Sequence, residues 1–202
     1  MTNKTPIYYT EKQMTDAIGF ACTNFGNGDE GTVMHELESE YVHTDVLYAD
    51  SALGGKMLAT FGMGARKMKA HPDFSSRIEL VMFASDGMDA DDCGKMVACS
   101  QLTAFSKFPF RENTWFGPWH TVTVSDMFKE KYGFDAFIFY PVNAHAEISR
   151  IGKVEYLVLL PIYQDELEFI MENEYSIFLE WLFEEYGEDA FLIDRQREHL
   201  MV

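Results

Sequence analysis

The order of helical and strand-like segments along the chain limits its fold more than any other feature of the sequence. The first helical segment opens at Thr10, with Gln13 three positions later, which is the arrangement of a capping box. Apolar residues then recur at helical spacing as far as Phe25, and Gly26 is suited to end a helix. We therefore expect a helix close to the N-terminus.

Two further helices are expected. One begins at Asp91 or Asp92, either of which can cap it, and runs to about Lys107. The other covers residues 175–186, where the apolar side chains share one helical face. These side chains are Tyr175, Phe178, Leu179, Leu182 and Tyr186.

Short apolar runs between these helices have the length and composition of β-strands. They cover residues 41–49, 57–61, 77–84, the end of 108–124, 135–142 and 154–161. We expect Pro161 to end the last strand, Gly62 and Gly64 to allow backbone turns, and the run 26–31 to be a loop. Helix, three strands, helix, three strands, helix is an α+β order. The prediction is an α+β fold with a mixed, largely antiparallel central sheet flanked by helices.

Length and composition favour a single domain over residues 1–202. The chain is 47% hydrophobic and 15% aromatic, which is too apolar for a disordered polypeptide. It shows no internal repeat and no linker. No apolar run reaches the length of about 18 residues that a membrane span needs, so no membrane contact is expected. The polar start lacks the apolar centre of a signal peptide, and we expect a cytoplasmic protein.

The charge of the chain limits its partners. Sixteen basic and thirty-three acidic residues give a net charge of −17, and such a surface repels nucleic acid. The bias is strongest from residue 164 to 202, which holds twelve Asp or Glu and only two Arg. This bias confers solubility, or else it steers a basic protein partner toward the surface.

The stretch "HELESEYVHTDV", residues 35–46, raises the question of a metal centre. A zinc hydrolase of the HExxH type needs its second His four residues after the first, and Ser39 occupies that position. Ligands could still assemble in space from His35, His43, Asp45 and His120, and a metal-dependent hydrolase is kept as an alternative. The serine-hydrolase elbow, the dinucleotide-binding pattern and the phosphate loop are all missing. We expect neither a metal nor another cofactor.

Several segments, read in order, resemble the suppressor-of-fused (SUFU) domain family, with the resemblance clearest over residues 35–183. They are "VHTDVL" (42–47), "ATFGMGARKM" (59–68), "IELVMF" (78–83), "LTAFSKFPFRENTWFGPWHTV" (102–122) and "LVLLPIYQDELEFIMENEYSIFLEWL" (157–182). One departure is "MFASDG" (82–87), where the family usually carries Leu-Pro.

The resemblance implies an α+β protein-binding domain without known catalysis. In animals the family member is a two-domain inhibitor that holds Gli-type transcription factors through a short peptide, and this chain is similar to its N-terminal domain only. Single-domain bacterial relatives are thought to be immunity proteins that bind and neutralise a cognate toxin. We expect this small acidic chain to be of the second kind, and we keep peptide binding by strand addition as an alternative regulatory function. Its oligomeric state is left open.

Two groups of residues follow from this interpretation. A partner surface is expected to include the aromatic pair Trp115 and Phe116 and an acidic ridge that imitates a polyanion. The ridge consists of Asp165, Glu166, Glu168, Glu172 and Glu174. The second group is a buried polar cluster that joins the sheet to the aromatic loop, formed by His43, Asp45, Glu79 and His120.

Overall fold

The structure, a computed structural model, describes residues 4–194 and 196–200, apart from the side chain of Asp29. Its helices are α1 (Glu11–Phe25), α2 (Asp92–Arg111), α3 (Asp126–Tyr132), α4 (Gln164–Glu172) and α5 (Tyr175–Tyr186). Its strands are β1 (Gly26–Met34), β2 (Asp45–Ser51), β3 (Lys56–Phe61), β4 (Ile78–Ala84), β5 (Thr121–Thr123), β6 (Ala136–Ile148) and β7 (Gly152–Ile162). Short 3-10 turns lie at η1 (Met63–Ala65), η2 (Asp86–Ala90) and η3 (Gly187–Phe191).

All of these strands join one seven-stranded sheet in the order β1-β2-β3-β4-β7-β6-β5. Neighbouring strands run antiparallel except β4 and β7, which pair in parallel with Leu80 opposite Leu157. The predicted fold class is therefore confirmed: the protein is α+β with a mixed, largely antiparallel sheet.

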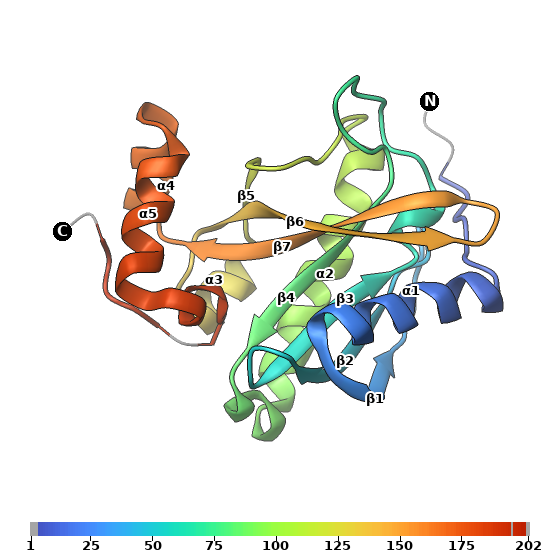
Figure 1. Cartoon of the computed structure of the whole chain (residues 1–202), viewed down its shortest axis with the longest axis horizontal. Coiled ribbons are helices and arrows are strands. Elements are labelled where there is room, and N and C mark those ends of the chain that lie inside the picture. The colour runs from blue at the N-terminus through green and yellow to red at the C-terminus, as the bar shows by residue number, and fades with distance from the viewer. Residues whose placement is uncertain (1–3, 195, 201–202) are drawn as a thin grey trace.

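Helices cover both faces of the sheet (Figure 1). Alternate residues of β7 show how the faces are divided, because successive side chains of a strand point to opposite sides. Leu157 and Leu159 pack with α2 and α3 in one buried cluster. Tyr156 and Val158 face α1 on the other side, and farther along the strand Leu160 and Ile162 meet α5 on that same side.

The helix boundaries follow the local signals in the sequence. The predicted capping box is present, with Thr10 Oγ1 accepting from Gln13 N at 3.4 Å and Gln13 Oε1 accepting from Thr10 N at 2.9 Å. Asp91 caps α2 by accepting a hydrogen bond from Gly94 N at 2.9 Å. The bounds predicted for α5 are confirmed. Within the described part of the chain, no helix is both long and apolar enough to cross a membrane.

Three sequence expectations about the elements are wrong. The run 26–31 is the start of β1 and not a loop, because β1 pairs with β2 along the sheet edge. The strand expected at 41–49 begins only at Asp45, since the backbone of Tyr41 has a φ of 65° and interrupts the extended chain. Helices α3 and α4 were not predicted. The turn expected at Gly62 is confirmed by its φ of 120°.

Candidate partner-binding surface

The acidic residues expected to form a ridge fall into two environments. Glu168, Glu172 and Glu174 are exposed on α4 and on the short connection to α5. Asp165 is half-buried, and both of its carboxylate oxygens lie 3.1 Å from Nδ1 of His199. Glu166 is fully buried at 0% exposure, so its predicted position on the ridge is wrong. The ridge contains fewer accessible carboxylates than the sequence indicates.

Glu166 is buried because it is the partner of Arg197. Its two carboxylate oxygens accept hydrogen bonds from the two terminal nitrogens of the Arg197 guanidinium, with Nη2 to Oε2 at 2.7 Å. The backbone N of Tyr163 donates to Oε2 at 3.0 Å, and Glu166 lies in the first turn of α4, where the helix dipole favours a carboxylate. The guanidinium also donates to the carbonyl oxygen of Pro161 at 3.2 Å. A buried ion pair of this kind persists because both charges are hydrogen-bonded.

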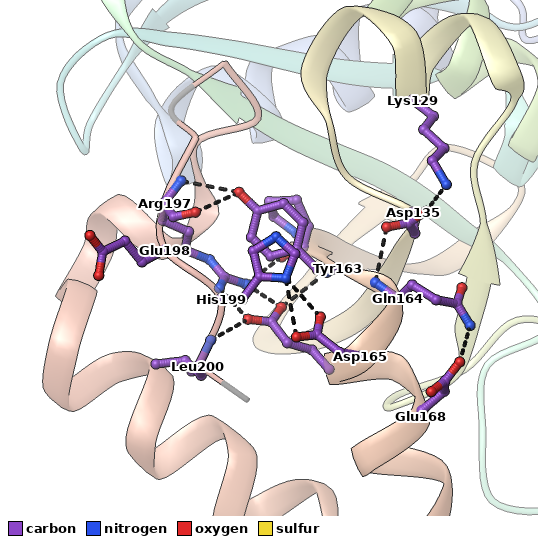
Figure 2. A network of polar contacts seen from close by, with 12 residues as sticks. Lys129, Asp135, Tyr163, Gln164, Asp165, Glu168, Arg197, Glu198, His199 and Leu200 are labelled. Atoms are coloured by element: carbon purple, nitrogen blue, oxygen red, sulfur yellow. Dashed lines mark hydrogen bonds and ion pairs between the residues drawn. The ribbon is translucent and has the colours of Figure 1, made fainter. Parts of the chain in front are cut away.

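Residues 196–200, which we call the C-terminal strap, cross over the start of α4 (Figure 2). The hydroxyl of Tyr163 donates to the carbonyl oxygen of Arg197 at 2.7 Å, and the His199 ring stacks on the Tyr163 ring with centroids 3.9 Å apart. At the other helix, the Tyr186 hydroxyl donates to the carbonyl oxygen of Glu198 at 3.1 Å. The strap therefore fixes the start of α4 relative to the end of α5.

The two aromatic residues expected at the partner surface are not equivalent. Phe116 is 2% exposed and packs between Phe108 and Phe139, so it belongs to the core and not to a contact surface. Trp115 is half-buried and stacks on His71 with centroids 4.2 Å apart. It borders a cleft of about 570 Å³ between α2 and the edge strand β5.

The predicted polar cluster is divided among three places. His43 Nε2 lies 3.1 Å from Asp45 Oδ1, and His35 Nδ1 lies 3.0 Å from Asp45 Oδ2, so these three side chains do meet. His120 instead packs against Trp115, where burial lowers the pKa of its imidazole. The expectation of one cluster is wrong because the aromatic loop that carries His120 covers a different part of the sheet.

Glu79 forms a separate buried site under the turn that follows β3. Its Oε1 accepts hydrogen bonds from Tyr9 Oη at 2.9 Å, Gly62 N at 2.9 Å and Gly64 N at 3.0 Å, while Oε2 accepts from Thr60 Oγ1 at 2.7 Å. Burial raises the pKa of Glu79, and these hydrogen bonds oppose the rise. Glu79 therefore joins the N-terminal segment to the sheet.

The four ligands proposed for a metal centre are not assembled, since His120 lies apart from the other three. In the described part of the chain, no group of three or more His, Cys, Asp or Glu side chains is arranged to hold a metal ion. His43 is hydrogen-bonded to Ser39, its Nε2 lies 3.1 Å from Asp45 Oδ1, and its ring stacks on Tyr8. These contacts hold the segment before β2 in place.

Two residues that matter on this side of the protein were missed by sequence reasoning. Arg197 is one of only two Arg in an acidic stretch, and that imbalance was the signal that it has a specific partner. Trp181 is absent from the set of residues predicted to form the apolar face of α5, and its side chain is 44% exposed. The available signal was that Trp181, a large apolar residue, lies outside this predicted apolar face.

Comparisons with known proteins agree with this fold. A sequence model of the family described as Suppressor of fused protein (SUFU) matches residues 40–198. A search of curated protein sequences finds no match.

Among solved structures, the chain is similar to the one described as the Sufu–Fu complex, with a TM-score of 0.63 and 11% identity over 94% of this chain and 93% of that one. A suppressor-of-fused homologue from Neisseria gonorrhoeae aligns with a TM-score of 0.61 and 16% identity over 93% and 95% of the two chains. Drosophila Suppressor of Fused gives a TM-score of 0.63 and 10% identity over 96% of this chain, which spans 52% of that protein. The family match covers most of the sequence, and the chain belongs to the suppressor-of-fused family.

Proposed function

We propose that this chain is a non-enzymatic binding protein that neutralises a cognate toxin by stoichiometric binding, as a cytoplasmic immunity protein. The observation that carries the proposal is the uncompensated negative charge around α4 and α5. Between residues 164 and 194 the sequence has eleven Asp or Glu and no Lys or Arg. Arg195 and Arg197 follow this stretch in the sequence. Arg197 forms a buried ion pair with Glu166, so its charge does not offset the exposed carboxylates.

Electrostatics explains why such a surface suits a toxin partner. Proteins that cleave nucleic acid need basic grooves to hold phosphates. An acidic protein that enters such a groove is attracted over long distances, and its association rate can exceed that of a neutral pair by orders of magnitude. Fast capture protects a cell that makes the toxin, and occlusion of the groove needs no catalysis.

Three of the side chains considered for a metal-dependent hydrolase, and Glu79 of the predicted polar cluster, have structural contacts that support binding over turnover. Asp45, His35 and His43 contact one another and the neighbouring backbone, and Glu79 is enclosed by four donors. Each of these groups holds a segment of the fold. The family relationship points in the same direction, because one relative was solved as the Sufu–Fu complex.

The proposal is tested by producing the chain together with the toxin domain encoded beside its gene. We expect the wild-type chain to restore growth and to form a stable complex on size-exclusion chromatography. The triple variant Glu168→Gln/Glu172→Gln/Glu174→Gln should protect less, and its association should depend less on salt. The matched control Glu38→Gln/Glu130→Gln/Glu147→Gln removes the same charge from exposed positions elsewhere and should protect normally. Absence of both protection and complex formation by the wild type would refute the proposal.

A further inference from the structure

We infer that the outer face of α5 is the docking surface for the partner, and that it receives an arginine side chain presented beside apolar groups. This inference rests on the proposed function for the identity of the partner. We define the α5 outer face as Ile177, Glu180, Trp181 and Glu184, all of which are exposed.

The helical spacing of α5 separates this face cleanly from the core. Phe178, Leu179 and Leu182 point into the protein and pack against β6 and β7. Ile177 and Trp181 stand four residues apart, and Glu184 follows at the next turn, so the three share the opposite side of the helix. Ile177 is 40% exposed and Trp181 is 44% exposed. Large apolar side chains that are exposed together mark a contact surface.

The Trp181 side chain is held in place although it is exposed. Its ring lies against the Phe169 ring of α4, with centroids 5.4 Å apart and an angle of 40° between the planes. A supported indole loses little conformational freedom on binding, and buried Trp residues dominate the binding energy of many interfaces. Trp181 is therefore the expected anchor.

A small pocket beside Trp181 gives the chemistry of the occupant. It has a volume of about 280 Å³ and is lined by Trp181, Glu184, Glu185 and Leu200. Among the described residues, neither Glu184 nor Glu185 forms an ion pair. An arginine fits this combination, because its planar guanidinium stacks on an indole and its fork of donors pairs with carboxylates.

The local sequence opposes helix stability at these positions. Glu184 and Glu185 lie in the last turn of α5, which contains no basic residue, and the negative end of the helix dipole disfavours carboxylates there. Glu180 and Glu184 are four residues apart, a spacing at which like charges repel. A basic partner would offset both the unfavourable helix dipole and the repulsion between the carboxylates. Binding such a partner accounts for these carboxylates, whereas the stability of the isolated protein does not.

The C-terminal strap builds one wall of the pocket. Leu200 is held there by its backbone N, which donates to Glu166 Oε1 at 3.4 Å, and by the neighbouring Arg197 pair. Arg197 and Leu200 belong to the same strap (Figure 2). Because Leu200 also lines the pocket beside Trp181, the strap connects the buried ion pair to the docking surface. Loss of the strap should open the pocket without removing Trp181.

One test needs no toxin. The protein labelled with 5-fluorotryptophan should give three fluorine NMR signals, and the signal absent in Trp181→Phe identifies Trp181. Titration with the capped tripeptide Gly-Arg-Gly should shift that signal, while the peptide with neutral citrulline in place of arginine should not. Equal shifts with both peptides, or no shift of the Trp181 signal with either, would overturn the inference.

The second test uses the neighbouring toxin domain and measures binding rates. Trp181→Ala should raise the dissociation rate at least about 30-fold, whereas Trp181→Phe should keep most of the affinity. The control Tyr8→Ala truncates an exposed aromatic side chain at a distant site and should leave the rate unchanged. Binding that is unaffected by Trp181→Ala would refute the docking surface. Failure of the wild type to bind would instead refute the proposed function, and the fluorine titration would still decide the inference.

Discussion

Glu166 carries a negative charge into the protein interior, and it can do so because Arg197 accompanies it. Removing a carboxylate from water costs several kcal/mol. The guanidinium offsets this desolvation cost by donating two parallel hydrogen bonds to the carboxylate. The rings of Tyr163 and Tyr186 lie 5.1 Å and 5.5 Å from the guanidinium carbon and exclude water from the pair. Each residue is tolerated only while the other is present.

Breaking this pair should therefore cost more than removing it. We predict that Arg197→Met lowers the free energy of unfolding by about 3–5 kcal/mol, because it leaves Glu166 buried and unpaired. The double variant Arg197→Met/Glu166→Leu should lose less than the sum of the two single variants. Urea denaturation of the four proteins measures the difference. Arg111→Gln, which removes an exposed pair with Glu112, should cost about 0–1 kcal/mol; equal losses for Arg111→Gln and Arg197→Met would contradict the prediction.

Glu79 gives a prediction with a defined pH dependence. Its pKa is raised above the ordinary value of 4.5 because the side chain is buried. Above pH 4.5 the unfolded chain releases this proton while the folded chain retains it, so the free energy of unfolding falls as pH rises toward the folded pKa. Glu79→Gln removes the titrating carboxyl and with it this pH dependence. The stability advantage of wild type over Glu79→Gln should therefore shrink as pH rises. Urea denaturation at several pH values from 4 upward measures it; an advantage that grows with pH would show that the four hydrogen bonds outweigh burial.

These two glutamates show where residue-level prediction ends. Glu166 lies in acidic sequence and was expected at the surface, whereas Glu79 was expected to be buried but with other partners. In both cases a decisive partner is distant in the chain. Glu166 meets Arg197 thirty-one residues later, and Glu79 meets Tyr9 seventy residues earlier. A sequence pattern reports periodicity within one element, whereas these contacts depend on which elements the fold brings together. His43 and Asp45, which the sequence analysis placed in one polar cluster, do meet, although His43 lies before the strand.

At the scale of elements, the turn between β3 and η1 depends on Gly62. Its φ of +120° is a conformation that L-residues rarely adopt, and a Cβ there would clash with the carbonyl oxygen of His43. Gly28 has a similar φ of +126°, but a Cβ there would meet nothing within 4 Å. A substitution at Gly28 therefore introduces backbone strain alone, whereas one at Gly62 introduces backbone strain and a steric clash.

We predict that Gly62→Ala is more destabilising than Gly28→Ala. Both substitutions carry backbone strain of about 1–3 kcal/mol. Only Gly62→Ala adds a clash in a packed site, for which about 1–3 kcal/mol more is expected. Thermal and urea unfolding of the two variants, at the same pH and protein concentration, provide the measurement. Similar losses for both would mean that the segment before β2 moves aside, and that the turn does not fix its position.

Elements with complete local signals were predictable, and the others were not. Helix α1 has a capping box, an apolar stripe and a terminal glycine, and α5 has about three turns of clear periodicity. Strand β1 has neither alternation nor β-branched residues over "GNGDEG", and within this run only Gly26 and Gly31 pair with β2, on either side of an irregularity in the register. Helix α4 is short and acidic, and its burial of Glu166 depends on the distant strap.

At the scale of the whole molecule, the fold collects negative charge at one end. The sheet places α4 and α5 together beside the ends of β6 and β7, away from α1 and β1 (Figure 1). Arg197 forms a buried ion pair with Glu166, so its charge does not offset the exposed carboxylates at this end. With a net charge of −17, the folded protein also repels itself. Stability alone would favour fewer carboxylates at this end.

The last prediction follows from that conflict. Glu184→Gln/Glu185→Gln should raise the free energy of unfolding by about 0.5–2 kcal/mol at low salt, because it removes two charges from the negative end of α5. Glu11→Gln is the control of opposite sign, since Glu11 lies in the first turn of α1, where a carboxylate is favourable. Both effects should shrink in 0.5 M salt, where charges are screened within a few ångström. If Glu184→Gln/Glu185→Gln instead weakens the fold, these carboxylates stabilise the isolated protein, and their position at the end of α5 requires no partner to explain it.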